Sequence, residues 1–526
     1  MQFVSSAFRM IEQTQAELDN SNGMGGSSAS GAAGGSSPGT AADVSSKSLD
    51  RSLAHAVAWN AIARWASQIL SWGSTIVVAR MLTPYDYGLI GMAGLYLNFT
   101  MLISRAGITD VILAFRNLTD RKIAELNSAS VLLGVVLLAL SLVVAAPIAH
   151  FFSTPPLLGV IAVSSLMYLF VGFQTVPKAL LQRELRFKLL AWIDMASAFS
   201  QIFVTVILAW LKFGYWSLVA GYVVSCVVTS VLSFACKRYE FALPRIAQMR
   251  GELRFARQAL VSQVASYAYG NADFLVAGRT LGGPALGNYT IAWTIASAPV
   301  DKIASLFTGV APAYFSTVQA DQLQLRRYLL GLTEALSLVT VPASIGIALV
   351  PDYIVLALLG PKWSGVVGPL RLLGIFIAGR SIATILPNIL TATREARFVM
   401  WATIASAIIL PMAFLIGSRW GTSGIAAAWV VAYPPLMVPM YYKVFQKTGT
   451  RVKEYISVLI PAVSASAIMA GAVLLSRWIV PIGPHPLLSL LLTVTVGAVS
   501  YCGALATFHR PRMSQMIAML RSIRNK

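Results

Sequence analysis

Helix-length apolar segments recur along almost the whole chain, and they constrain its fold more than any other feature. A helix that crosses a bilayer needs about 20 predominantly apolar residues. Such segments lie near 56–79, 88–108, 128–150, 157–177, 190–211, 214–235, 257–278, 286–311, 328–350, 368–390, 398–418, 424–442, 456–479 and 487–508. Only 11% of the residues are charged, against roughly 25% in soluble domains. We therefore expect an all-α integral membrane protein with about 14 transmembrane helices.

The loops between these segments are alternately rich and poor in lysine and arginine. Arg121, Arg250 and Arg451 each lie in a rich loop, whereas the intervening loops hold at most one basic residue each. Under the positive-inside rule the rich loops are cytoplasmic. The pattern therefore predicts a multi-pass protein with both termini in the cytoplasm.

The net charge of +20 is spread over these loops. A nucleic-acid-binding domain instead gathers its basic residues on one folded face, so we expect no nucleic-acid partner. Basic loops beside a membrane attract anionic headgroups, which makes membrane lipids the expected partners. Cys226, Cys236 and Cys502 lie in or at the ends of spans without metal-ligand spacing. No metal site and no cofactor are expected.

The two ends of the chain differ from the middle. Residues 1–50 include a segment from Ser21 to Ser46 made almost entirely of glycine, serine, alanine and threonine. Such a segment buries too little surface to fold, so we expect a disordered cytoplasmic tail. The alternative is that translation starts later, for instance at Met24. Residues 510–526 are expected to form a basic cytoplasmic tail.

An internal repeat is indicated at an offset of 199 residues, from 80 to 279. Arg80-Met-Leu82 followed by Gly88 has its counterpart in Arg279-Thr-Leu281 followed by Gly287. The same offset places Arg64 on Gln263, Ser67 on Ser266 and Gln68 on Tyr267. An offset that spans six helices keeps the topology parallel, so two lobes would be related by an axis along the membrane normal.

The repeat divides the expected membrane domain into three parts. An N-terminal lobe of six helices occupies 51–240, and a C-terminal lobe of six helices occupies 241–447. Two further helices occupy 448–509.

Four spaced motifs resemble the polysaccharide exporter family, of the colanic-acid and O-antigen type, in the multidrug/oligosaccharidyl-lipid/polysaccharide flippase superfamily. They are Val78–Gly88, Ala179–Phe187, Asn271–Gly282 and Leu359–Gly365, within a resemblance that covers roughly 51–450. The resemblance implies a two-lobed fold around a central cavity, in a bacterial inner membrane. It implies alternating access, driven by an ion gradient, and a cargo of undecaprenyl-pyrophosphate-linked oligosaccharide. A polysaccharide polymerase and co-polymerase are the further partners it suggests.

Polar residues recur at three- and four-residue spacing on four of the expected helices, and such spacing lines one helical face. They are Asn60, Arg64 and Gln68 on the first helix; Gln263, Tyr267, Asn271 and Asp273 on the seventh; Asp301 and Lys302 on the eighth; and Arg380 and Asn388 on the tenth. Charged residues within a membrane are costly and mostly face a bundle interior or a water-filled cavity. Hydroxyl-bearing residues in the same stripes also serve ordinary helix packing.

The three cations Arg64, Lys302 and Arg380 form a candidate pyrophosphate site, because arginine meets phosphate oxygens bidentately. The alternative is that each cation forms a buried ion pair with Asp301, Asp273 or Glu334. The sugar would be held by amide and hydroxyl groups and by stacking on aromatic rings. The candidates for the sugar site are Asn60, Gln68, Gln263, Tyr267, Asn271 and Asn388.

Three acidic residues are candidates for ion coupling: Asp301, Asp273 and Glu334. A carboxylate desolvated in a cavity approaches the range where it exchanges protons. Asp301 is the first candidate because it lies near the middle of its helix, within the polar stripe. The sequence does not choose between protons, sodium and the membrane potential.

Two rival functions remain open at this point. A drug or cation antiporter of the same superfamily would need an acidic or aromatic cavity, whereas the charges within these spans are mainly cationic. A membrane enzyme of polysaccharide assembly would need catalytic groups on a substantial loop. The expected outer loops are instead short connectors, so we expect no catalytic residues.

Overall fold

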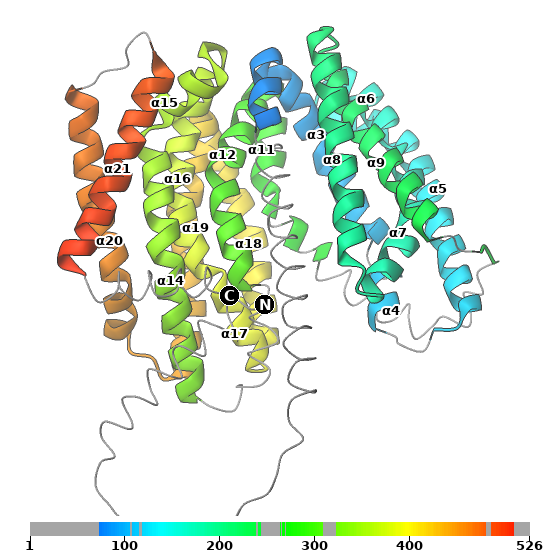
Figure 1. Ribbon diagram of the computed structural model, residues 1–526. Helices are drawn as coiled ribbons and strands as arrows, with labels where there is room; N and C mark the ends of the chain where they lie inside the picture. Colours follow the sequence, from blue (N-terminus) through cyan, green and yellow to red (C-terminus); the bar gives the residue numbers. More distant parts are fainter. Residues whose placement is uncertain are drawn as a thin grey trace, which may run out of the picture.

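The computed structural model describes residues 73–105, 108–114, 118–237, 240–242, 270–308, 322–479 and 485–509, together with 263, 264 and 266–268. All assigned elements in this part of the chain are helical, and they form two groups and a pair (Figure 1). The N lobe contains α3 (Pro84–Arg105), α4 (Ile108–Ala114), α5 (Asp120–Phe151), α6 (Pro156–Ser164), α7 (Met167–Arg183), α8 (Phe187–Trp210) and α9 (Trp216–Cys236).

The second group, the C lobe, begins with α11 (Ala272–Leu281) and α12 (Gly283–Thr308). It continues with α14 (Gln322–Leu349), α15 (Pro351–Ile354), η2 (Val355–Leu359), η3 (Pro361–Val366), α16 (Val367–Ala383), α17 (Ile385–Ala392), α18 (Ala396–Gly417), η4 (Ser418–Trp420) and α19 (Gly421–Thr448). The pair consists of α20 (Val452–Ile479) and α21 (Pro486–Phe508). The predicted boundaries of the lobes stay predictions.

Within the described residues, 10 helical stretches are long and apolar enough to cross a membrane. One of them, Ala396–Thr448, contains both α18 and α19. The segments expected from 88–108 to 214–235 and from 286–311 to 487–508 all fall on helices in their described parts. Those at 157–177 and 368–390 each run across two consecutive helices, α6–α7 and α16–α17. The segments expected at 56–79 and 257–278 lie largely outside the described residues. The prediction of an all-α, multi-pass membrane protein is confirmed.

The helices place large apolar side chains outward and small polar ones inward. Trp478, for example, is 84% exposed in the absence of lipid. The buried Ser141 and Thr340 hydroxyls donate to the carbonyls of Leu137 and Leu336, four residues earlier in their own helices. A hydroxyl that satisfies itself in this way costs little inside a membrane and allows close helix packing.

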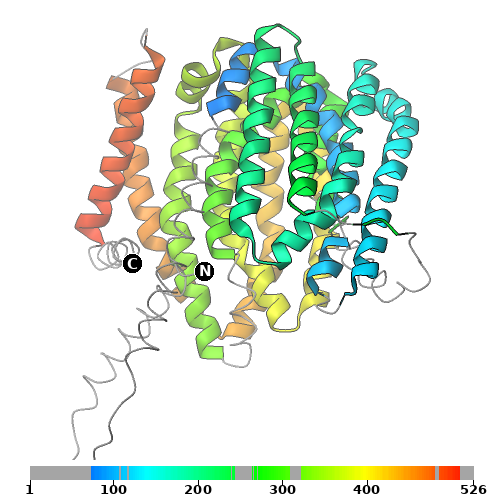
Figure 2. The ribbon, with the colours of Figure 1, turned by 45° about the vertical axis from the view of Figure 1, so that its right-hand side comes forward.

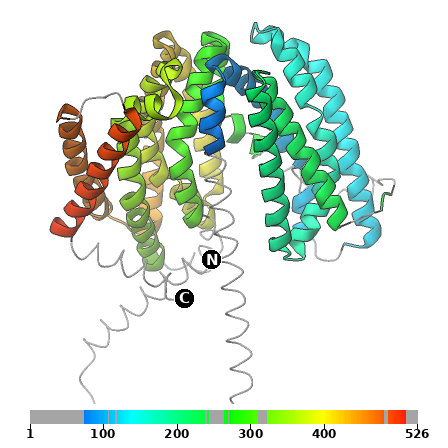
Figure 3. The same cartoon turned by 45° about the horizontal axis from the view of Figure 1, so that its top comes forward.

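The two lobes meet where α3 and α12 begin, and we call this end of the bundle the closed end. The Trp363 indole Nε1 donates to the carbonyl of Ala79 at 2.9 Å, and Arg80 Nε donates to the carbonyl of Leu358 at 2.7 Å. Lys362 Nζ donates in return to the carbonyl of Arg80 at 2.6 Å. Figures 1 and 3 show the two groups of helices approaching each other at this end and diverging toward the other.

Glycines let the backbones of α3 and α12 touch at the closed end. A Cβ atom added to Gly88 would overlap the carbonyl of Gly283, and one added to Gly287 would overlap the carbonyl of Pro84. The two contacts are reciprocal. Pro84 and Gly283 are 199 positions apart in the chain, and so are Gly88 and Gly287. The lobes therefore meet through residues related by the offset of the sequence repeat.

The opposite end, which we call the basic end, carries the loops rich in lysine and arginine. Ion pairs there join residues of one lobe. In the N lobe Lys237 Nζ lies 2.5 Å from Glu184 Oε1. In the C lobe Lys447 Nζ lies 2.7 Å from Glu395 Oε1. These pairs strengthen each lobe separately.

The α20–α21 pair stands beside the C lobe (Figure 2). Arg326 of α14 pairs with Glu454 at 2.7 Å, and Arg477 of α20 pairs with Asp352 at 3.1 Å. The Tyr501 hydroxyl of α21 donates to the carbonyl of Leu338 at 2.7 Å. Polar contacts at both ends of α14 therefore fasten the pair to this lobe.

Candidate functional site

Arg380 and Asp301 lie together between α16 and α12. Arg380 Nη1 is 3.7 Å from Asp301 Oδ1, and the guanidinium carbon lies 5.5 Å from the centre of the Trp293 ring. Nη1 is buried and makes no hydrogen bond within the described part of the chain. Arg380 is therefore held by a loose ion pair and an aromatic face, and part of its donor capacity is unused.

Arg380 lies in the last turn of α16 but within the longer candidate span Pro361–Ala392, and Asp301 lies well inside α12. Asp301 is 18 residues after Gly283, or ~27 Å along a helix ~39 Å long at ~1.5 Å per residue. The side chains of Arg380 and Asp301 are nevertheless 32% and 52% exposed. Exposed charges within a membrane are costly in hydrocarbon, so we expect these two to face a cavity between helices.

Asp273 occupies a different setting, enclosed within the C lobe. Its side chain is 0% exposed. The Tyr289 hydroxyl of α12 donates to Asp273 Oδ2 at 2.7 Å, and the Trp429 Nε1 of α19 donates to the same oxygen at 2.9 Å. Oδ1 has no hydrogen-bond partner among the described residues. Oδ2 thus accepts two hydrogen bonds, and Oδ1 is left able to take a proton.

Aromatic rings connect Arg380 with Asp273. The Trp293 ring, which lies against Arg380, has its centre 5.8 Å from that of Trp429, the donor to Asp273. Phe376 stacks on Trp429 at 4.7 Å and lies 6.2 Å from Trp293. Packed interiors transmit displacement because they contain few voids. A continuous series of ring contacts therefore links Asp273 with Arg380.

Five other predicted site residues lie in the described part of the chain. Tyr267 spans the two lobes, since its hydroxyl donates to the carbonyl of Leu95 at 2.8 Å. Asn271 Nδ2 donates to the carbonyl of Tyr267 at 2.9 Å, and Asn388 Nδ2 to that of Thr384 at 3.3 Å. Gln263 is half-buried, as is Glu334 on α14. The roles predicted for these residues stay predictions.

Four predicted site residues cannot be placed. Asn60, Arg64 and Gln68 lie outside the described residues, as do both tails. Lys302 lies in the described backbone of α12, but its side chain lies outside the described part. The cluster of three cations therefore stays a prediction, with Arg380 as the member whose surroundings are known.

Sequence reasoning missed Tyr289 and Trp429, the two donors to Asp273. Trp429 lies 156 residues from Asp273 in the chain, so no local spacing links them. The available signal was their chemistry, because a buried tyrosine or tryptophan usually finds a partner for its polar tip.

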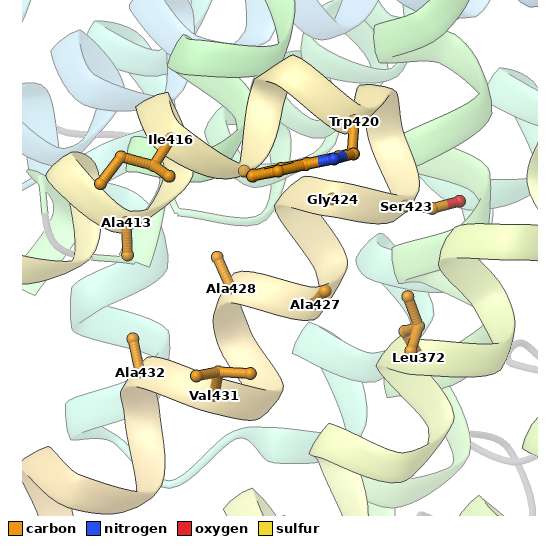
Figure 4. A pocket seen from close by; sticks show the side chains of 11 residues that line it. Leu372, Ala413, Ile416, Trp420, Ser423, Gly424, Ala427, Ala428, Val431 and Ala432 are labelled. Atoms are coloured by element: carbon orange, nitrogen blue, oxygen red, sulfur yellow. The ribbon is translucent and has the colours of Figure 1, made fainter.

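A separate hollow of about 510 Å³ lies against α16, α18 and α19. Figure 4 shows that small side chains of α18 and α19 line it beside the Trp420 ring. None of the described residues that line it is charged. The hollow therefore offers nothing to an anionic headgroup and is not part of the candidate site.

Comparisons with known proteins agree with this architecture. A family model described as "Polysaccharide biosynthesis protein" matches residues 77–368. The succinoglycan biosynthesis transport protein ExoT of Rhizobium meliloti (strain 1021) is 23% identical over 490 residues, covering 91% of this chain and 97% of the relative. The lipopolysaccharide biosynthesis protein WzxC of Escherichia coli (strain K12) is 23% identical over 407 residues, covering 76% of this chain and 82% of the relative.

Among solved structures, the chain resembles the lipid II flippase MurJ in an inward closed conformation. The TM-score is 0.69 at 14% sequence identity, covering 86% of this chain and 99% of that structure. At this identity the likeness concerns the fold alone.

Proposed function

The chain belongs to the polysaccharide biosynthesis protein family, and from this premise we propose that it flips an undecaprenyl-pyrophosphate-linked oligosaccharide across the bacterial inner membrane. It is a membrane transporter of polysaccharide biosynthesis and not an enzyme. The observation that carries the choice of cargo is Arg380, a partly exposed cation within the candidate span Pro361–Ala392.

The proposed architecture has about 14 spanning helices, arranged as two six-helix lobes and a C-terminal pair. The basic end faces the cytoplasm, as the positive-inside rule requires, and both termini lie there. The closed end then faces outward. The arrangement described above is the state that accepts cargo from the cytoplasm.

In this state Asp301 serves Arg380 as a replaceable counter-ion. The 3.7 Å separation is longer than a charge-assisted hydrogen bond. A pyrophosphate can therefore displace Asp301 and take up the unused Nη1 donor. Arg64 and Lys302 would complete the charge complement of the same headgroup. The sugar would contact Asn60, Gln68, Gln263, Tyr267, Asn271 and Asn388.

We assign ion coupling to Asp273 ahead of Asp301 and Glu334. Its burial makes an uncompensated negative charge costly, and two donors to a single oxygen leave the second oxygen for a proton. Binding or release of that proton changes the charge beside Trp429, and the aromatic rings carry the change to Arg380. A polymerase that consumes the flipped unit is the proposed downstream partner.

Complementation of an export-deficient strain tests this function, with each variant scored beside its abundance by immunoblot. Arg380→Ala should reduce export about ten- to hundredfold at normal abundance, because a hydrogen bond to a charged group contributes roughly 1.5–3 kcal/mol. Arg380→Lys should rescue export only in part, since lysine keeps the charge but lacks the planar fork.

Asp301→Asn is the matched control, because it removes the same ion pair from the acidic side. If Arg380 acts on the cargo, Asp301→Asn retains most export. If the pair is only structural, both variants lower abundance, and the double variant Arg380→Ala/Asp301→Asn restores it. Full export by Arg380→Ala would refute the site.

A further inference from the structure

The closed end is built from two halves related by the offset of the repeat. We call Ala79 and Arg80, with their C-lobe partners, the Arg80 half. We call Gly278 and Arg279, with their N-lobe partners, the Arg279 half. Each arginine reaches across to the other lobe, near the point where a long helix of that lobe ends. Arg80 meets η2, which follows α14 and the short α15, and Arg279 meets the end of α5.

The Arg80 half is held by hydrogen bonds to backbone carbonyls. Arg80 donates to Ala357 and Leu358, and Trp363 donates to Ala79. Lys362 donates a hydrogen bond in the opposite direction, to the carbonyl of Arg80. Trp363 is fully buried, and the Tyr87 ring packs edge-on against it at 5.4 Å.

The Arg279 half is held by apolar and cation–π contacts. The Arg279 guanidinium carbon lies 5.4 Å from the centre of the Phe151 ring. A Cβ atom added to Gly278 would lie 2.9 Å from Phe152 Cε1. Phe151 is 45% exposed, so the Arg279 half lies at the outer surface of the helix bundle.

The two kinds of contact differ in what it costs to part them. The carbonyl of Ala79 and the indole of Trp363 are fully buried, so parting them would leave both groups without a hydrogen-bond partner. Aromatic surfaces that separate in lipid exchange one apolar contact for another, because lipid tails are as apolar as side chains. The Arg279 half is therefore the easier half to open.

We propose that the closed end opens by parting the Arg279 half, between α5 and α11, while the Arg80 half persists as the hinge. This proposal rests on the flippase function, since a cargo with a lipid tail must leave sideways into the membrane. The headgroup then exits past Phe151, and the tail never leaves the hydrocarbon.

Locking each half in turn tests the proposal. The background variant has Cys226→Ala, Cys236→Ser and Cys502→Ser. The gate pair is His150→Cys/Thr280→Cys, and the hinge pair is Met81→Cys/Ser364→Cys. All four positions are exposed neighbours of the contact residues. A short bis-maleimide is added to cells, export is measured, and mass spectrometry verifies the bridge.

Bridging the gate pair should abolish export, and bridging the hinge pair should leave it near the background level. N-ethylmaleimide, which modifies both thiols without joining them, should leave both pairs active. The proposal is overturned if both bridges block export, if only the hinge bridge does, or if neither does. Failure of the flippase function itself would show separately, because the unbridged background variant would not restore export.

Discussion

The closed end and the basic end hold the molecule together by different physics. At the closed end the lobes contact each other through glycine backbones and through hydrogen bonds such as Trp363 to Ala79. At the basic end, ion pairs such as Lys237–Glu184 join helices within one lobe. The first kind of contact depends on close geometry, and the second is screened by water and salt.

This difference indicates that each lobe moves as a unit and that the lobes move relative to each other. Ion pairs inside a lobe keep its helices in register while the lobe turns as a body. In the proposed transport cycle the Arg279 half of the seam parts and re-forms while the Arg80 half holds the lobes together, so residues of both halves should control export more strongly than protein abundance. Residues at the basic end should affect stability slightly and export less. Three sets of variants test this comparison, in decreasing order of expected effect.

The largest effect is expected from Gly88→Ala and Gly287→Ala. Each added Cβ atom meets a backbone carbonyl that has no freedom to yield. Overpacking typically costs about 1–3 kcal/mol, which would weaken closure by roughly five- to 150-fold. Export relative to immunoblot abundance should fall accordingly.

Gly94→Ala is the matched control on the same helix. The nearest atom to its added Cβ is Asn98 Nδ2, at 3.6 Å, which is ordinary contact. Export should stay at the wild-type level. Equal export by Gly88→Ala and Gly94→Ala would show that the seam does not need to close.

A smaller loss is expected from Trp363→Phe, which keeps an aromatic ring but removes the N–H that serves Ala79. One such hydrogen bond contributes roughly 1 kcal/mol, so closure should weaken about fivefold. Trp420→Phe is the control, because Trp420 is 70% exposed and borders the apolar hollow. If the two variants export equally well, the indole hydrogen bond does not hold the seam.

The smallest effect is expected from Glu395→Gln at the basic end. The pKa of the Glu395 carboxyl lies below its ordinary value, mainly because Lys447 donates a hydrogen bond to it. A lowered pKa stabilises the folded state above the unfolded pKa of about 4.3, and this contribution is lost as the pH falls through the folded pKa. Export should stay within about twofold of wild type.

The pH dependence can be measured as Tm in detergent. Wild type should unfold at a slightly higher temperature than Glu395→Gln near pH 7, and the difference should vanish below the folded pKa. A Tm difference that persists in acid, or an export defect as large as that of Gly88→Ala, would remove the distinction between the two ends.

Much of the fold could be predicted from the sequence because lipid imposes a simple rule on spanning helices. The expected segment 456–479, for example, lies within α20, Val452–Ile479. The predicted repeat also matches the contact between α3 and α12, which needs a glycine on each of the two helices. Gly88 and Gly287 therefore stand at equivalent positions.

The candidate site could be predicted only in part. The polar stripe indicated Asp301 as the first coupling candidate, but the structure places Arg380 beside it. Asp273 owes its enclosure to Tyr289 and Trp429, which come from two other helices. Which helices pack together decides the surroundings of a carboxylate, and hydrophobic periodicity does not contain that information.

The proposal that the closed end and the basic end move in opposite senses is tested most directly by pulsed EPR. The measurement uses the background variant without native cysteines, in lipid vesicles. Spin labels at His150→Cys and Thr280→Cys report the closed end, and labels at Lys188→Cys and Arg394→Cys report the basic end. On addition of undecaprenyl pyrophosphate, a longer closed-end distance should appear together with a shorter basic-end distance. Closed-end and basic-end distances that stay unchanged, or that lengthen together, would contradict the account.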